Sequence, residues 1–213
     1  LSQAFARLGS AVTQVERGDR LLAREDPEVS AHARTSLEAD GVRVCTGTTA
    51  RSTRYREDGE KVLRVESGPD GPREEIPFDE LLLAVGRKPR TEGYGLEELG
   101  IPAPRTVETN EYLETLYPNI LAAGDVAGPY QFTHMAAHQA WFATVNALFG
   151  DLRRFRADYR AVPWTTFLDP EIGHLGLNEQ EATATGVAYE VTRYELSELD
   201  RALTYGTDRG FLK

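Results

Sequence analysis

The chain has 213 residues, of which 40% are hydrophobic and 27% are charged, an ordinary mixture for a globular protein. Its formal net charge is −10 and no basic run opposes that charge, so a nucleic-acid partner is not expected. No apolar stretch approaches the ~20 residues that a membrane helix needs, no signal peptide is recognisable, and the single cysteine, Cys45, cannot form an internal disulfide. We therefore expect a soluble cytoplasmic protein that has no membrane partner.

The chain begins inside a helical pattern. Leu1, Phe5 and Leu8 recur at spacings of four and three residues, which predicts a helix that Gly9 ends. The stretch AVTQVE (11–16) then reads as a short strand. Because the first residue is not methionine and already belongs to a regular element, we expect the sequence to be a fragment of a longer protein.

A second helix and several strands follow. Asp26 is a plausible N-cap with Pro27 at the first helical position, and Gly41 closes this helix. Strands are expected in VRVCTG (42–47), in TARSTRYRE (49–57) and EKVLRVES (60–67) with a hairpin turn at Asp58-Gly59, and in FDELLLAVG (78–86), which reads as a buried strand. This order favours an α/β nucleotide-binding domain with an antiparallel insertion, ending near residue 90.

The second half of the chain carries fewer strand signals. We expect one strand in NILAAG (119–124), one long helix from Thr133 to Phe149, and a domain boundary in FRADYRAVPW (155–164). After it, the sequence predicts strand, turn, strand, and then a helix whose N-cap is Asn178 in a capping box with Glu181. The last residues, RGFLK (209–213), read as a further strand.

Glu16 stands where the first strand ends. In a dinucleotide-binding unit, an acid about 20 residues beyond the glycine-rich turn accepts the ribose hydroxyls, and counting back from Glu16 places that turn just before Leu1. A carboxylate here favours NAD over NADP, because it repels a 2′-phosphate, although Arg17 and Arg20 lie close enough to weaken the preference. The alternative is a surface glutamate at the end of a strand.

Asp125 follows a short apolar run and Gly124. A carboxylate at the carboxyl end of a strand suits the hydroxyls of a sugar or ribityl chain, and Gly124 lets a ligand approach the backbone closely. The alternative is a turn aspartate that bonds the amides of its own loop.

The helix that begins at Thr133 could use its first N–H groups to stabilise an anion or an electron-rich ring edge, and His134 could add a donor. The alternative for His134 is a cap or a surface group. Ala136 is small enough for close packing against a flat ligand or a second helix, whereas Met135 reads most simply as a core residue.

A metal site is not expected. His134 and His138 share a helix face, but no glutamate follows His134 as the HExxH pattern of zinc proteases requires, and His174 is distant in the sequence. Cys45 has no CxxC partner and reads as a buried structural thiol.

Taken in order, four stretches resemble the flavin-dependent pyridine nucleotide–disulfide oxidoreductases, and the resemblance covers nearly the whole chain. They are LSQAFARLGSAVTQVERGDRLL, LLLAVGRKPRTEG (in which Arg90 replaces the usual Asn of the family's GRxPN link), TNEYLETLYPNILAAGDVAG and VPWTTFLDPEIGHLGLNEQEA. The stretch PYQFTHMAAHQAWFA is most similar to the mercuric reductase and dihydrolipoyl dehydrogenase branch.

The resemblance implies Rossmann-like FAD- and NAD(P)-binding domains, both incomplete, and the start of an α+β dimerisation domain. We expect an NAD(P)-binding domain without its first strand and glycine-rich loop in residues 1–90, the C-terminal half of an FAD-binding domain in 91–158, and a truncated dimerisation domain in 159–213. It implies FAD and NAD as cofactors, with NADP not excluded, and a homodimer. The cofactor-binding residues that it implies are Glu16, Gly86, Arg87, Gly124, Asp125, Thr133, His134, Met135 and Ala136.

Among these, Asp125 is expected on the FAD ribityl chain, the helix from Thr133 at the flavin pyrimidine, Glu16 on the NAD ribose and Gly86 beside the nicotinamide. The family passes electrons between NAD(P)H, FAD and a disulfide, a dithiol or mercuric ion. Its CxxxxC pair, both glycine loops and its His–Glu pair are absent from this sequence, so we expect no catalytic residue here and no activity of the fragment alone. The alternative is a flavin-dependent NADH oxidase, or a non-catalytic nucleotide-binding module, that lacks the redox disulfide.

Overall fold

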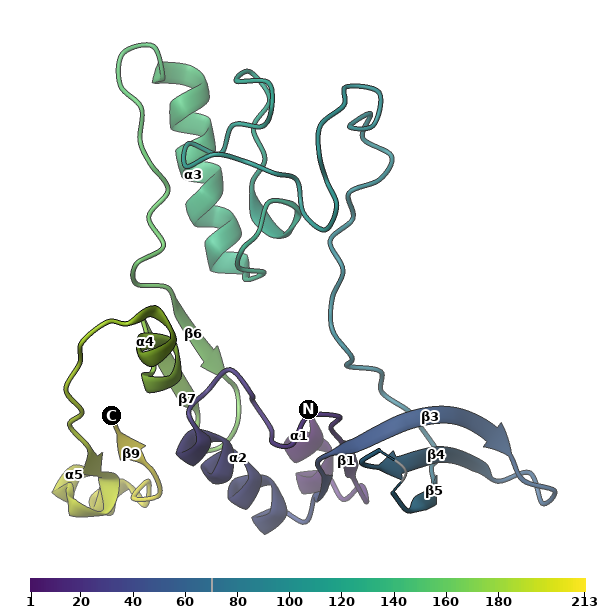
Figure 1. Ribbon diagram of the computed structural model, residues 1–213. Coiled ribbons are helices and arrows are strands. Elements are labelled where there is room, and N and C mark those ends of the chain that lie inside the picture. Colours follow the sequence, from purple (N-terminus) through teal and green to yellow (C-terminus); the bar gives the residue numbers. More distant parts are fainter. Residues whose placement is uncertain (70) are drawn as a thin grey trace. The chain divides into compact units, whose positions relative to one another are not determined.

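The computed structural model describes residues 1–69 and 71–213. Its elements, drawn in Figure 1, are α1 (Ser2–Arg7), β1 (Thr13–Val15), α2 (Pro27–Ala39), β2 (Arg43–Cys45), β3 (Thr48–Tyr55), β4 (Lys61–Ser67), β5 (Arg73–Pro77), η1 (Gly124–Val126), α3 (Thr133–Phe149), β6 (Pro163–Thr166), β7 (Ile172–Leu175), α4 (Glu179–Thr185), β8 (Tyr194–Glu195), η2 (Leu196–Glu198), α5 (Asp200–Tyr205) and β9 (Phe211–Leu212). The chain forms two compact units. One consists of Leu1–Leu82 with Pro163–Lys213, and the other of Leu83–Val162. None of the described helices has both the length and the apolar character needed to cross a bilayer.

The first unit begins with a parallel pair of strands, β1 and β2, connected through α2. Leu37 of α2 packs against Leu21, Val42 and Val44 to form a small core. Burying each Leu or Val side chain contributes about 1.5–3 kcal/mol, so this cluster stabilises the strand–helix–strand unit. The predicted elements of this region, from the first helix to the strand VRVCTG, are confirmed.

Strands β3, β4 and β5 form an antiparallel sheet. The predicted hairpin is confirmed: Gly59 has the positive φ of 86° that the turn between β3 and β4 requires, and the Asp58 carboxylate accepts a hydrogen bond from the Glu60 amide at 3.0 Å. Strand β5 was not expected from the sequence, because its REEIP segment carries no clear alternation.

The prediction of a buried strand in residues 78–86 is wrong. That segment contains no strand, and Leu82, Leu83 and Val85 have relative exposures of 63, 74 and 92%. An apolar run becomes a strand only where a neighbouring strand offers N–H and C=O groups in register. Among the described residues no strand pairs with this segment, so its apolar side chains stay exposed.

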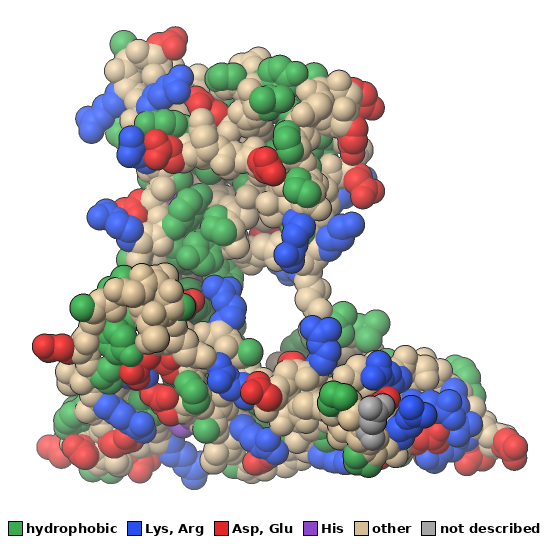
Figure 2. All heavy atoms as spheres, in the orientation of Figure 1, with side chains coloured by type: hydrophobic (Ala, Val, Ile, Leu, Met, Phe, Trp, Pro, Cys, Tyr) green, Lys and Arg blue, Asp and Glu red, His purple; other side chains and the backbone are tan. Residues whose placement is uncertain are grey.

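Arginine and glutamate side chains alternate on one face of the β3–β5 sheet, where Figure 2 shows blue and red side chains side by side. The Glu75 carboxylate accepts hydrogen bonds from Arg54 (2.8 Å) and Arg64 (3.0 Å), and Arg56 lies 3.4 Å from it. The hydrogen bonds from Arg54 and Arg64 are the largest causes that lower the pKa of Glu75 to about 2. One carboxylate on β5 thus bonds arginines from both other strands.

We expect Glu75→Gln to destabilise the protein most at neutral pH. Since the folded-state pKa of Glu75 is lowered, its contribution is fully present above the unfolded-state value near 4.5 and is lost as the pH falls towards about 2. Urea unfolding of both proteins between pH 7 and pH 2.5 should show a stability difference that narrows with acidification. Glu57→Gln, which changes an exposed acid in the turn between β3 and β4, is the control. A stability difference for Glu75→Gln that stays constant with pH would contradict the prediction.

The C-terminal segment of the first unit contains the predicted strand, strand and helix and the predicted last strand, whereas β8, η2 and α5 were not expected from the sequence. Strands β6 and β7 form an antiparallel hairpin, and β8 pairs with β9 at the end of the chain. The capping box of α4 is confirmed, because the Asn178 side chain accepts a hydrogen bond from the Glu181 amide at 2.9 Å while the Glu181 side chain accepts one from the Asn178 amide at 3.4 Å.

Polar contacts join this segment to the start of the chain. The Gln3 side chain accepts a hydrogen bond from the Asp169 amide at 2.8 Å and donates one to the Asp169 carbonyl at 3.0 Å. Asp26 stands at the N-cap position of α2 as predicted, but its carboxylate does not cap that helix. It accepts instead from the amides of Glu179 (3.2 Å) and Gln180 (3.3 Å) in the first turn of α4.

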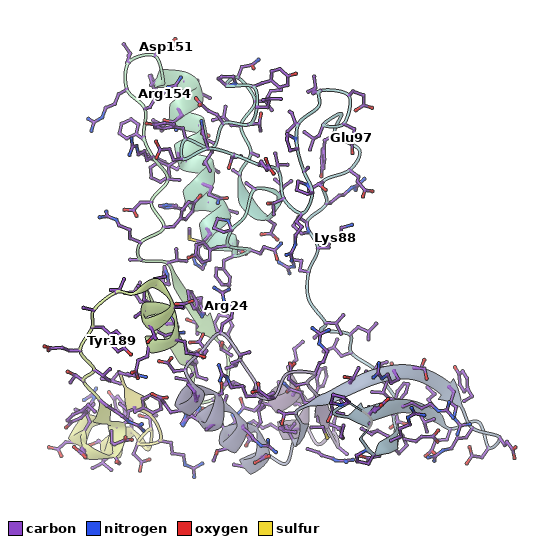
Figure 3. The ribbon with its side chains drawn as sticks, in the orientation of Figure 1. Arg24, Lys88, Glu97, Asp151, Arg154 and Tyr189 are labelled. Carbon is purple, nitrogen blue, oxygen red and sulfur yellow. The ribbon has the colours of Figure 1, made fainter. Side chains whose placement is uncertain are left out.

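The same junction contains a buried histidine and glutamate. The two ring nitrogens of His174 lie 2.7 Å from Glu25 Oε2 and 2.8 Å from the carbonyl oxygen of Gly176, and both side chains are only 7% exposed. Trp164 donates its indole N–H to Glu25 at 2.8 Å and stacks on the His174 ring, while Arg24, labelled in Figure 3, lies 5.3 Å from the centre of the Trp164 ring. Filling both contacts of His174 requires a proton on each ring nitrogen or a proton on Glu25.

We expect His174→Leu and Glu25→Leu each to lower the free energy of unfolding by about 3 kcal/mol, because either change leaves a buried polar group without its partner. The double variant should lose clearly less than the sum of the single losses. Chemical denaturation of the four proteins measures this coupling. Additive losses would mean that the two side chains do not interact in solution.

The second unit contains α3 and a set of loops. Its core includes Ile101, Val107 and Ala122. The predicted helix Thr133–Phe149 is confirmed. The strand expected in residues 119–124 is wrong, because the segment makes only a single bridge between Leu121 and Glu114. The backbone turns away at Gly124, which leaves too few residues for a ladder. The units divide the chain after residues 82 and 162, and the predicted domain limits near 90 and 158 stay predictions.

Candidate cofactor site

The turn that carries Asp125 lies directly against α3. Gly124 has a φ of 82°, which favours glycine, and a Cβ added to it would lie 3.2 Å from the Cβ of Ala136 on α3. Two residues predicted from the sequence, Gly124 and Ala136, are thus in contact. The small side chain at each position allows the backbone of the turn to approach the helix.

A residue that sequence reasoning missed, Gln139, fastens this turn. Its side chain is fully buried (0% exposed), accepts a hydrogen bond from the Gly124 amide at 2.6 Å and donates to the Gly128 carbonyl at 2.6 Å and to the Tyr159 hydroxyl at 2.9 Å. The available signal was a polar residue four positions after Met135, on the buried face of the helix.

The Asp125 side chain is partly exposed, at 38%. Arg87 Nη1 lies 3.4 Å from Asp125 Oδ2, so two further predicted residues are brought together. Because Arg87 is 70% exposed, this ion pair contributes only about 0–1 kcal/mol and leaves the carboxylate able to accept other donors. Gly86, with a φ of 121°, precedes Arg87 and is exposed.

Within the described part of the chain, Asp125 accepts no hydrogen bond from the amides of its own turn. The alternative interpretation, an aspartate that serves only its loop, therefore has no support in the geometry. The turn is closed by backbone bonds instead, from the amides of Ala127 (2.9 Å) and Gly128 (3.1 Å) to the Gly124 carbonyl.

The start of α3 lies next in the chain. Phe132 occupies its N-cap position and makes no side-chain capping bond, while Thr133 and His134 are exposed. The His134 ring stacks on Phe132 with their centres 5.3 Å apart. Met135 is 4% exposed, which agrees with its interpretation as a core residue. The positive end of the helix dipole is therefore presented beside small and aromatic side chains.

Glu16 belongs to the first unit and lies at the carboxyl end of β1, as predicted. Its Oε1 accepts a hydrogen bond from the Gly18 amide at 2.6 Å, and its backbone bonds the carbonyl of Cys45 at 2.8 Å. One carboxylate oxygen is engaged in the turn, and the other can still accept a hydroxyl.

Three carboxylates of the first unit, those of Asp26, Glu28 and Glu179, lie within 4.8 Å of one another, a spacing that could hold a metal ion. The Lys213 ammonium pairs with all three, at 2.8 Å from Asp26 and 2.5 Å from Glu28. Burial acts to raise the pKa of Asp26, but bonds from Lys213 and two backbone amides hold it below its usual value. The Lys213 ammonium therefore already bonds all three carboxylates and offsets one of their three negative charges.

Two family matches cover most of the chain. Residues 1–140 match the pyridine nucleotide-disulphide oxidoreductases, and residues 162–213 match the dimerisation domain of the same proteins. The chain belongs to the pyridine nucleotide-disulphide oxidoreductase family. The predicted family is thereby confirmed. The predicted fold class, Rossmann-like nucleotide-binding domains followed by the start of a dimerisation domain, agrees with both matches.

The chain has similar relatives among the mercuric reductases and the dihydrolipoyl dehydrogenases, the branch predicted from the sequence. The chain is 39% identical over 214 residues to a mercuric reductase of Streptomyces lividans and 39% identical over 215 residues to a dihydrolipoyl dehydrogenase of Thermus scotoductus, and it covers 44% and 46% of those proteins. Both alignments include 100% of this chain. The chain therefore spans somewhat less than half the length of the relatives it matches.

Solved structures with a similar fold come from related proteins. The chain resembles the flavoprotein disulfide reductase RclA of Escherichia coli with a TM-score of 0.82 and 28% identity, and LpdA of Mycobacterium tuberculosis with a TM-score of 0.84 and 29% identity. Each match includes 99% of this chain and 46% and 44% of the respective structure.

We expect Gly124→Ala to lower the free energy of unfolding by about 1–2 kcal/mol, because the new residue adopts a left-handed conformation and its Cβ meets Ala136. Adding Ala136→Gly should give little net recovery, because a glycine within a helix costs about 0.5–1 kcal/mol and the conformational cost at position 124 remains. Gly173→Ala is the matched control, because a Cβ there meets nothing within 4 Å and the backbone is not left-handed. Thermal unfolding compares the four proteins, and equal stability of Gly124→Ala and Gly173→Ala would contradict the expectation.

Proposed function

We propose that this chain is part of a FAD-dependent NAD(P)H oxidoreductase that passes electrons between NAD(P)H, FAD and a disulfide, a dithiol or mercuric ion. The observation that carries the proposal is the turn Gly124–Val126, which packs against α3 and leaves the Asp125 side chain partly exposed. Membership of the pyridine nucleotide-disulphide oxidoreductase family and a relationship to mercuric reductases and dihydrolipoyl dehydrogenases support it.

The residues of the second unit fit a flavin nucleotide. Gly124 has no Cβ, so the turn can lie flat against α3, and Asp125 offers an acceptor-only group of the kind that binds the hydroxyls of a ribityl chain. The N-terminus of α3 offers its positive dipole end to an electron-rich ring, while the Ala136 N–H already bonds the Phe132 carbonyl at 2.9 Å. FAD, when bound, supplies the hydride and electron transfer.

The chain's own residues then have separate tasks. Asp125 binds and orients the ribityl chain of the flavin. The start of α3 stabilises negative charge on the flavin ring. Gly86 and Arg87 lie on the link that precedes the core of this unit. Cys45 is the single cysteine of the sequence and lies within β2, so we assign it no redox role and place the reacting thiols outside these 213 residues.

Glu16 is proposed to accept the ribose hydroxyls of NAD. The geometry of its neighbour supports NAD over NADP. Arg20 donates to the carbonyl of Ala23 at 2.9 Å and to the side chain of Gln180 at 2.6 Å, so its guanidinium is engaged within the fold. Arg17 is exposed and is the remaining cation close to Glu16 in the sequence.

We further propose that the enzyme is a homodimer, because residues 162–213 match the family's dimerisation domain. The proposed substrate-facing groups and the second half of the FAD site belong to the part of the family fold that lies beyond these residues. The proposed location is the cytoplasm.

The first test is the FAD affinity of the full-length enzyme with Asp125→Asn. Removing the charge weakens a charge-assisted hydrogen bond, so we expect the Kd for FAD to rise by about tenfold or more, measured by reconstituting the apoprotein and following the flavin absorption near ~450 nm. Asp151→Asn is the matched control, because Asp151 is an exposed acid in the loop after α3, as labelled in Figure 3. An unchanged Kd in Asp125→Asn would sink the assignment of Asp125, and a colourless wild-type enzyme of full mass would sink the proposed function.

A further inference from the structure

We infer that Gln139 is a positioning residue for the flavin: one buried amide holds both ends of the turn that carries Asp125. The inference rests on the proposed function of Asp125. Among the described residues Gln139 makes no hydrogen bond to the Asp125 carboxylate, and it bonds the turn only through its backbone.

The first step is the geometry of the three bonds. Gly124 and Gly128 stand at the two ends of the turn and are both buried, so their backbone groups are shielded from water. The side-chain oxygen of Gln139 accepts a hydrogen bond from the Gly124 N–H, and its NH₂ group donates one to the Gly128 carbonyl. Both donor–acceptor distances are 2.6 Å. The Gly128 amide also bonds the Gly124 carbonyl at 3.1 Å, so the turn is closed on two sides.

The second step is the chemistry of the side chain. A primary amide offers an acceptor and two donors in one plane, which is the set that this position uses, because the second N–H goes to the Tyr159 hydroxyl at 2.9 Å. Rotating the amide by half a turn places an NH₂ group against the Gly124 N–H, so the orientation follows from the network. Neither an apolar residue nor a carboxylate can reproduce all three bonds.

The third step separates positioning from stability. Asn146 lies seven residues further along α3, is 8% exposed and also makes three amide bonds, to the Tyr112 carbonyl (3.1 Å), the Phe155 carbonyl (2.8 Å) and the Phe155 amide (2.8 Å). These bonds hold other loops of the same unit. A change at Asn146 thus disturbs the fold in a comparable way without touching the turn at Asp125.

The experiment compares Gln139→Leu, Gln139→Glu, Tyr159→Phe and Asn146→Leu in the full-length enzyme. For each we would measure the Kd for FAD, the near-ultraviolet circular dichroism of bound flavin and the stability to urea. We expect Gln139→Leu to raise the Kd by about tenfold, because two buried groups of the turn lose their partner and Asp125 moves. Gln139→Glu keeps the bond from Gly124 and repels the Gly128 carbonyl, so its Kd should be intermediate, and Tyr159→Phe should change it by about twofold or less.

Hydrogen exchange of the Gly124 amide in the apoprotein supplies a readout that does not depend on flavin. Exchange should speed up in Gln139→Leu and stay at the wild-type rate in Asn146→Leu, even where both variants lose the same stability. Equal rates in these two variants would overturn the inference, as would a wild-type Kd in Gln139→Leu or an equal rise in Asn146→Leu. If Gln139→Leu does not fold, the Kd for FAD and the exchange rate of the Gly124 amide in Gln139→Glu, compared with those in Asn146→Leu, test the inference instead. A wild-type enzyme that binds no FAD would overturn the proposed function, while the exchange data would still test how the turn is held.

Discussion

The site depends on how closely the backbone of Gly124 can lie against α3. At that position the turn has no side chain of its own, and the facing residue of the helix, Ala136, contributes only a methyl group. Gln139 satisfies the polar groups that this close contact removes from water. The side of the turn that faces α3 is therefore filled and hydrogen-bonded, while the Asp125 side chain stays partly exposed.

Directional polar contacts organise the first unit in a similar way. Gln3 bonds Asp169, Asp26 bonds the first turn of α4, and Glu25 bonds His174, so residues near the start of the chain contact residues more than a hundred positions later. Such bonds contribute modestly to net stability, because each replaces a bond to water. They fix position instead, since an amide or carboxylate has few orientations in which all its partners are satisfied.

Local patterns predicted the local elements well. The helix Thr133–Phe149 and the capping box of Asn178 with Glu181 have the predicted bounds and bonds, since periodicity and caps act within a few residues. The strands expected in residues 78–86 and 119–124 do not form. Both predictions came from apolar runs, and such a run indicates burial somewhere in a protein without naming the strand that must pair with it.

By itself the sequence determined the family, the order of most elements, and the short motif in which Gly124 and Asp125 precede a helix, because these are properties of neighbouring residues. Only the tertiary structure decided that Gln139 holds that turn, that Arg87 pairs with Asp125, and that Asp26 serves a distant helix rather than its own. The physical reason is that a hydrogen-bonding group can bond any suitable donor or acceptor that packing brings within about 3 Å. Which partner arrives is a property of the folded chain, and no spacing in the sequence records it.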